Sequence, residues 1–143
     1  MPVELILFDL DDTLLRTTDL SCFRGREFLN KQSPAYVQNL RAQFSALPNR
    51  IVYSEAQLLA FQEQYEGVQL GVFTRSPRHY ATILLALAYP NVEWATLVGF
   101  EDVTQTKPSG EGVLLAMRVA EVTLPQNVWL IGDGKSDVQA AYD

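Results

Sequence analysis

Short apolar runs recur along the chain, and each is followed by a polar segment. They lie at residues 3–8, 69–73, 95–98 and 127–131. Continuous apolar runs of this length are typical of strands that are buried on both faces of a parallel sheet. Helical patterns lie between the later runs, and strand–helix–strand alternation implies right-handed crossovers. The sequence therefore predicts an α/β fold with a parallel sheet flanked by helices.

Three helices are expected after the second, third and fourth runs. Ser76 and Pro77 mark the start of the first, over residues 78–88, because serine caps helix N-termini and proline suits the first helical position. The second opens at residue 109 or 110 and runs to about 122, with an apolar stripe along one side. The third begins near residue 137.

Residues 15–66 interrupt this alternation of strands and helices, because they contain no short apolar run that is typical of a buried strand. Helices are expected from Asp19 to about Lys31, from Ser33 to about Ala46, and from Ser54 to about Glu66. Ser54 and Gln57 have the spacing of a capping box. We interpret this stretch as a helical insertion between the first and second strands of the sheet.

Composition and charge exclude several classes of protein. The formal net charge is −6 without a cluster of Lys or Arg, so no nucleic-acid partner is expected. Cys22 is the only cysteine, which excludes an intramolecular disulfide. No signal-peptide pattern and no apolar stretch of membrane-spanning length occurs, so we expect a cytoplasmic protein without membrane contact. A small phosphorylated metabolite would also meet a repulsive field, unless its site were locally positive.

Polar residues stand at or just after the C-terminal ends of the predicted strands, namely Asp9-Leu10-Asp11, Thr74, Lys107-Pro108 and Gly132-Asp133. Ligand sites in open α/β sheets lie beyond these ends, so the four groups can converge. Each group alone has a plainer interpretation as a turn, a cap or a solvated side chain, and for Asp12 we favour a turn role. Their coincidence in this order favours a site.

Asp9 and Asp11 lie two residues apart, so both side chains can face one crevice. Their charges repel unless a cation balances them, and Mg²⁺ with oxygen ligands from Asp9 and Asp133 supplies that balance. We expect Asp9 to attack phosphorus and form an aspartyl-phosphate, while Asp11 protonates the leaving oxygen and later activates water. The metal and Lys107 would hold the phosphoryl oxygens, and Thr74 would donate a hydrogen bond to one.

These residues, in this order, resemble the haloacid dehalogenase superfamily. F-D-L-D-D-T-L at 8–14 is similar to its first motif, Thr74 to the second, Lys107-Pro108 to the third, and I-G-D-G-K-S-D at 131–137 to the fourth. The resemblance implies a Rossmann-like core and a small all-helical cap at 15–66, with 1–14 and 67–143 forming the core. It also implies a Mg²⁺-dependent phosphatase that hydrolyses a small phosphate monoester.

The resemblance also assigns roles to single residues. Asp9 would be the nucleophile and Asp11 the acid and base. The metal would be held by the Asp9 carboxylate, the Asp11 backbone carbonyl, Asp133 and Asp137. The substrate phosphate would be bound by Thr74, Arg75 and Lys107. True dehalogenases of the superfamily lack an acid two residues after the nucleophile, so Asp11 favours phosphoryl transfer.

Several alternatives stay open at this point. A phosphomutase or a phosphonate-cleaving relative would use the same aspartyl-phosphate chemistry. A receiver-type signalling domain is disfavoured, because its phosphorylated aspartate follows the third strand and no helical insertion follows its first. In the insertion, candidate substrate contacts are Arg16, Cys22, Arg24 and Arg41, although an exposed position is the commoner outcome for an arginine. His79 is expected to be an ordinary exposed helix residue.

The chain ends at Asp143, whereas the family pattern continues with a helix and usually a fifth core strand. From this we expect a weakly held metal, low or no turnover, and self-association through the strand at 127–131 as an exposed sheet edge. A non-catalytic remnant that binds a metal or a partner is a further alternative.

Overall fold

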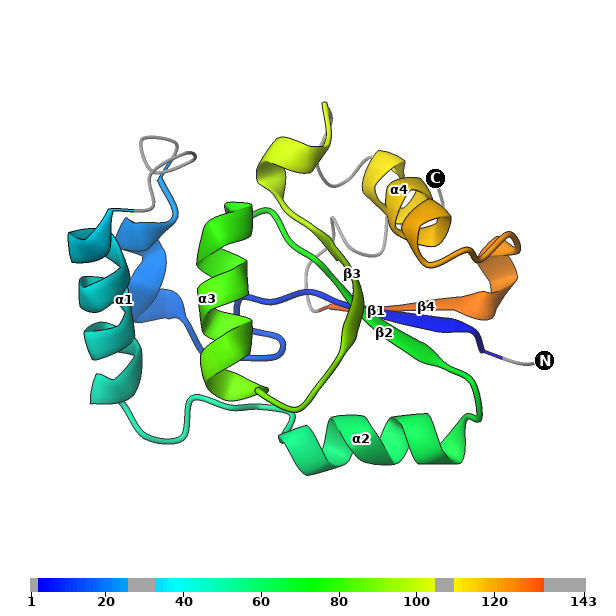
Figure 1. The fold of residues 1–143 in the computed structure, drawn as a ribbon, viewed down its shortest axis with the longest axis horizontal. Helices are drawn as coiled ribbons and strands as arrows, with labels where there is room; N and C mark the ends of the chain where they lie inside the picture. Colours follow the sequence, from blue (N-terminus) through cyan, green and yellow to red (C-terminus); the bar gives the residue numbers. More distant parts are fainter. Residues whose placement is uncertain (1–2, 26–32, 105–109, 133–143) are drawn as a thin grey trace.

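A computed structural model of the chain describes residues 3–25, 33–104 and 110–132. At its centre is a parallel sheet with the strand order β3-β2-β1-β4 (Figure 1). The strands are β1 (Leu5–Phe8), β2 (Gln69–Phe73), β3 (Trp94–Val98) and β4 (Val128–Ile131). All three strand pairs are parallel, so the predicted α/β class is confirmed. Each predicted strand is also present, with its start shifted by two residues or fewer.

Alternate residues of β1 enter two separate apolar clusters. Ile6 and Phe8 belong to a cluster that includes buried residues of α3 (Arg78–Ala88). Leu5 and Leu7 belong to a second cluster, which contains residues of α4 (Glu111–Val119). The sheet is thus covered on both faces, because side chains of a strand alternate between its faces. This two-sided burial explains why β1 is a continuous apolar run and not an alternating one.

The predictions for α3 and α4 are largely confirmed. α3 has the expected bounds, Arg78–Ala88, but Pro77 occupies the N-cap position and not the first helical position. α4 is shorter than expected and ends at Val119. The helix predicted near residue 137 lies outside the described residues.

The insertion contains a 3-10 helix, η1 (Thr18–Phe23), and two α-helices, α1 (Pro34–Ala46) and α2 (Glu55–Gln64). Both α-helices begin as predicted. The Ser33 hydroxyl accepts a hydrogen bond from the backbone of Tyr36, and Ser54 forms its capping box with Gln57.

The α-helix expected from Asp19 is wrong over the residues described, where the chain forms only the 3-10 turn. The physical reason lies in the capping residues. Thr17 occupies the N-cap position but makes no side-chain cap, since its hydroxyl donates to Asp11. Asp19 accepts hydrogen bonds from Arg50 instead. Two side chains that would start a helix are therefore used in tertiary contacts.

The insertion and the sheet share one apolar cluster. It includes Leu40 of α1 and Leu58 of α2 together with Phe8 of β1. The rings of Phe8 and Phe61 lie 6.5 Å apart, so α2 packs against the sheet as the crossover between β1 and β2. α1 lies alongside α3 (Figure 1). The boundaries of a core and a cap at residues 15 and 66 stay a prediction.

His79 on α3 is buried by the packing of α1 against that helix. The expectation of an exposed side chain is wrong, because His79 is 7% exposed. Its ring lies 5.1 Å from the ring of Tyr36 on α1. The insertion therefore buries a face of α3 that would otherwise be exposed. Within the part of the chain that the structure describes, no helix is long and apolar enough to cross a membrane.

Candidate active site

The carboxyl ends of the strands bring together those predicted site residues that the structure describes. The backbone N–H of Asp9, directly after β1, donates to the carbonyl of Ile131 at the end of β4 over 2.9 Å. The N–H of Thr74, directly after β2, donates to the carbonyl of Val98 at the end of β3, also over 2.9 Å. The hydrogen-bonding pattern between the parallel strands thus continues for one residue beyond their ends, and it places Asp9 and Thr74 at the same edge of the sheet.

A cavity of about 390 Å³ lies at this edge. It is lined by four of the predicted residues, Asp9, Asp11, Thr74 and Arg75. Three further polar residues complete the described lining, namely Ser21, Arg24 and Ser76. The remaining predicted site residues, Lys107, Asp133 and Asp137, lie outside the described residues. The structure thus brings four of the seven predicted residues to one cavity, while the role of each stays a prediction.

The loop after β1 is a tight turn closed by Asp12. Asp12 has a φ of 60°, in the left-handed region that aspartate tolerates better than most residues. Its N–H donates to the carbonyl of Leu15, and its carboxylate accepts hydrogen bonds from the N–H of Thr17 and the hydroxyl of Thr18. These contacts fit the turn role that the sequence favours for Asp12, and they direct the chain back past Asp11.

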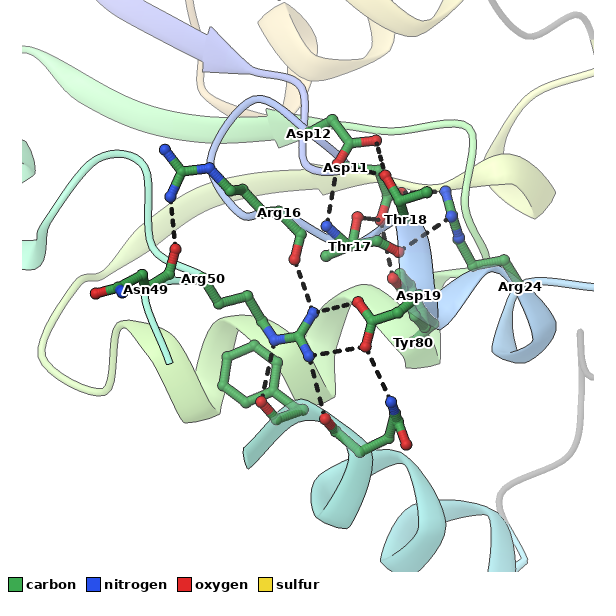
Figure 2. Close-up of polar contacts among 12 residues, drawn as sticks. Asp11, Asp12, Arg16, Thr17, Thr18, Asp19, Arg24, Asn49, Arg50 and Tyr80 are labelled. Carbon is green, nitrogen blue, oxygen red and sulfur yellow. Dashed lines mark hydrogen bonds and ion pairs between the residues drawn. The ribbon is translucent and has the colours of Figure 1, made fainter. Parts of the chain in front are cut away.

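The carboxylate of Asp11 is held from several directions (Figure 2). Its Oδ1 accepts hydrogen bonds from the hydroxyls of Thr17 and Tyr80, over 2.7 and 2.8 Å. Its Oδ2 accepts a hydrogen bond from the hydroxyl of Ser76 and lies 3.6 Å from Nη1 of Arg24. Thr17 and Arg24 come from the insertion, whereas Ser76 and Tyr80 come from the segment after β2. Both parts of the chain therefore fix this side chain.

Tyr80 is a site residue that the sequence did not reveal. Burial, reinforced by the negative charge of Asp11, raises the pKa of the Tyr80 phenol far above its usual value. The hydroxyl therefore stays protonated and donates to Asp11 at any ordinary pH. Nothing in the local sequence marks Tyr80, because its partner is 69 residues away. The only available signal was its place in the first turn of the helix after Thr74.

Mg²⁺ is a chemically reasonable occupant of this edge of the sheet. Asp9 and Asp11 offer the oxygen ligands that this ion prefers. No group of three Asp, Glu, His or Cys side chains that could hold a metal occurs among residues 3–25, 33–104 and 110–132. The described part thus supplies two of the four predicted ligands. The other two predicted ligands, Asp133 and Asp137, lie outside the described residues, and the four-ligand site stays a prediction.

Comparison with known proteins identifies the family. A family model described as haloacid dehalogenase-like hydrolase matches residues 23–142. The chain therefore belongs to the haloacid dehalogenase-like hydrolases, as its motifs predict. Within this family its relatives include enzymes named as phosphatases.

Two such relatives differ in how much of their length the chain matches. A phosphoglycolate phosphatase of Pseudomonas putida is 33% identical over 76 residues, which cover 53% of this chain and 28% of the relative. A pyrophosphatase, PpaX, of Oceanobacillus iheyensis is 24% identical over 168 aligned positions, which cover 96% of this chain and 78% of the relative.

A solved structure gives the same fold. CbbY from Rhodobacter sphaeroides, a mutant in complex with xylulose-1,5-bisphosphate, superimposes with a TM-score of 0.73. The match covers 98% of this chain and 82% of CbbY, at 21% sequence identity. The likeness confirms the Rossmann-like α/β architecture.

Proposed function

We propose that this chain is a Mg²⁺-dependent phosphatase that hydrolyses a small phosphate monoester through an aspartyl-phosphate on Asp9. The observation that carries the proposal is the cavity itself. Asp9, Asp11, Thr74 and Arg75 line it together, at the carboxyl ends of β1 and β2. A nucleophile, an acid–base group and phosphate-binding groups within one cavity are what phosphoryl transfer to a carboxylate requires.

The first half-reaction forms a bond between the Asp9 carboxylate and phosphorus as the ester P–O bond breaks. Asp11 gives its proton to the leaving oxygen, so that an alcohol departs. In the second half-reaction Asp11 takes a proton from water, whose oxygen attacks phosphorus and releases inorganic phosphate and the Asp9 carboxylate. Mg²⁺, held by Asp9, Asp11, Asp133 and Asp137, would neutralise the charge on the phosphoryl oxygens.

Thr74 is suited to bind a phosphoryl oxygen. Its side chain is buried, and its Oγ1 accepts a hydrogen bond of 3.1 Å from the N–H of Ser76. Because this contact uses a lone pair of Oγ1, the hydroxyl hydrogen is left to donate to a phosphoryl oxygen. Arg75 is exposed at the rim of the same cavity and supplies positive charge.

The names of the relatives support the substrate class. They act, by name, on phosphoglycolate and on pyrophosphate, both of which are small phosphorylated compounds. A small phosphorylated metabolite is accordingly the proposed substrate, and the cytoplasm the proposed compartment.

A turnover screen over small phosphate esters, with and without Mg²⁺, tests the proposal. We expect release of inorganic phosphate from at least one ester, and none after chelation of the metal. A second test assays the Asp11→Asn variant, since a general acid is needed most when the leaving group is poor. It should lose far more activity on an alkyl phosphate than on p-nitrophenyl phosphate. Equal losses on both would indicate that Asp11 only positions other groups.

A further inference from the structure

Two arginines of the insertion have opposite environments. Arg50 is 4% exposed, and all three of its guanidinium nitrogens donate hydrogen bonds. Nε donates to the carbonyl of Phe44, and the two Nη atoms reach the Asp19 carboxylate over 2.7 and 3.0 Å, together with the carbonyls of Arg16 and Gln43. Arg50 is therefore satisfied within the fold and has no capacity left for a ligand.

Arg24, at the end of η1, is poorly satisfied by comparison (Figure 2). Its Nη2 reaches the carbonyl of Thr17 only at 3.3 Å, and its Nη1 lies 3.6 Å from Asp11. Its Nε is enclosed and has no hydrogen-bond partner among the described residues. Buried polar atoms in folded proteins are nearly always paired. The guanidinium thus keeps hydrogen-bonding capacity that the described fold does not use.

The position of Arg24 allows these unused donors to bind a ligand in the cavity. Its side chain is 23% exposed and lines the cavity that also contains Asp9 and Asp11. Arg24 is not needed to fill the hydrogen-bonding capacity of Asp11, because the hydroxyls of Thr17, Ser76 and Tyr80 already donate to that carboxylate. A separation of 3.6 Å is also longer than a normal hydrogen bond. Arg24 therefore presents to the cavity, from the side of the insertion, a guanidinium whose N–H donors are not all used.

We propose that Arg24 binds a second anionic group of the substrate, a carboxylate or a second phosphate that is not transferred. The inference rests on the proposed phosphatase activity and defines its substrate class. A guanidinium has a planar fork of donors that matches either group with two parallel hydrogen bonds. Arg75 from the core and Arg24 from the insertion both line the cavity, so two arginines are available for the two anionic groups of such a substrate.

Three esters on the same two-carbon skeleton test this inference, assayed with Mg²⁺. They are 2-phosphoglycolate, ethylene glycol bisphosphate and 2-hydroxyethyl phosphate, which carry a carboxylate, a second phosphate and a neutral hydroxyl. We expect at least a tenfold higher kcat/KM for one or both of the first two than for the third. Arg24→Gln should remove that preference, through a higher KM for the preferred anionic ester.

Two further variants separate the role of Arg24 from general effects. Arg24→Lys keeps the charge without the planar fork and should retain part of the preference. Arg41 on α1, another candidate contact, is exposed and is not among the described residues that line the cavity, so Arg41→Gln removes the same charge and should change none of the three rates. An equal fall on all three esters in Arg24→Gln, or no preference in the wild type, would overturn the inference.

Calorimetric binding of the same three esters to the Asp9→Asn variant keeps the inference testable when turnover is absent. Tighter binding of an anionic ester, lost in the Asp9→Asn, Arg24→Gln double variant, would support the role of Arg24 even if the proposed phosphatase activity failed. Equal binding of all three esters would contradict it.

Discussion

The Tyr80 hydroxyl donates a hydrogen bond of 2.8 Å to Oδ1 of Asp11. Tyr80 lies in the first turn of α3 and is fully buried, whereas Asp11 lies in the turn after β1. The contact joins two segments that are 69 residues apart in the sequence. It anchors the proposed acid–base residue to a helix of the core, so the orientation of Asp11 depends on Tyr80.

Replacing Tyr80 by phenylalanine tests this dependence. The ring remains to fill its buried position, and only the hydroxyl is lost. We expect kcat to fall roughly tenfold on an alkyl phosphate, where proton donation by Asp11 matters most, and less on p-nitrophenyl phosphate. The free energy of unfolding should fall by about 1 kcal/mol, the usual contribution of one hydrogen bond. Steady-state kinetics on both esters and thermal unfolding measure these effects.

Tyr89→Phe is the matched control. Tyr89 is also buried, and its hydroxyl donates to the backbone carbonyls of Tyr53 and Leu14, away from the described lining of the cavity. This variant should lose similar stability but keep the wild-type ratio of rates on the two esters. The same ratio in Tyr80→Phe as in Tyr89→Phe would contradict a positioning role for Tyr80.

Arg50 connects three segments of the insertion, so its loss should be costly. Arg50→Met keeps most of the buried volume but removes every hydrogen bond to Asp19 and to the carbonyls around it. We expect a loss of about 3 kcal/mol, because breaking a buried pair leaves its polar partners unsatisfied. Asp19 is 29% exposed and can be hydrated once Arg50 is lost, so the loss should lie near the low end of the range for a broken buried ion pair. Chemical denaturation measures it, with exposed Arg41→Gln expected to stay within about 0.5 kcal/mol of wild type.

The same pair predicts a dependence of stability on pH. Hydrogen bonding to Arg50 holds the pKa of the Asp19 carboxyl well below its usual range. Above pH of about 4, Asp19 is ionised in both the folded and the unfolded chain, so its pair with Arg50 contributes its full stability. Below that pH the unfolded chain binds a proton that the folded chain does not, and the contribution is lost. The Tm difference between wild type and Asp19→Asn should therefore be largest near neutral pH and shrink below pH 4. A difference that is constant with pH would contradict this.

Magnesium should stabilise the protein as well as activate it. A metal that binds only the folded state raises Tm by mass action. We expect Mg²⁺ to raise the Tm of the wild type, and Asp133→Ala, which removes a predicted ligand, to abolish the increase. Chelation that changes neither Tm nor turnover would show that the metal assignment is wrong.

The sheet could be predicted closely because its signal is local. The central strands β1 and β2 are buried on both faces, so each is a continuous apolar run that is followed by a polar residue. The starts of α1 and α2 could be predicted equally well, since the side chains of Ser33 and Ser54 accept capping hydrogen bonds from residues only three positions away. The meeting of Asp9, Asp11 and Thr74 at one cavity followed from parallel topology alone.

Long-range contacts within the insertion could not be predicted in this way. Asp19 was expected to start an α-helix, but its carboxylate binds Arg50, which is 31 residues further along the chain. His79 was expected to be exposed, but α1 packs over it. Tyr80 reaches the site because α3 packs beside the turn after β1, and Arg24 because the insertion folds over the same edge of the sheet. No pattern of spacing in the sequence encodes these contacts.

Turnover by the Asp9→Asn variant tests the central claim most directly. If the Asp9 carboxylate attacks phosphorus, the amide cannot replace it. The variant should then release less than about a hundredth of the phosphate that wild type releases, with an unchanged Tm in the absence of metal. Mass spectrometry of the wild type during turnover should also show phosphate bound to the peptide that contains Asp9. An Asp9→Asn protein with more than that hundredth of the wild-type rate would contradict the covalent mechanism.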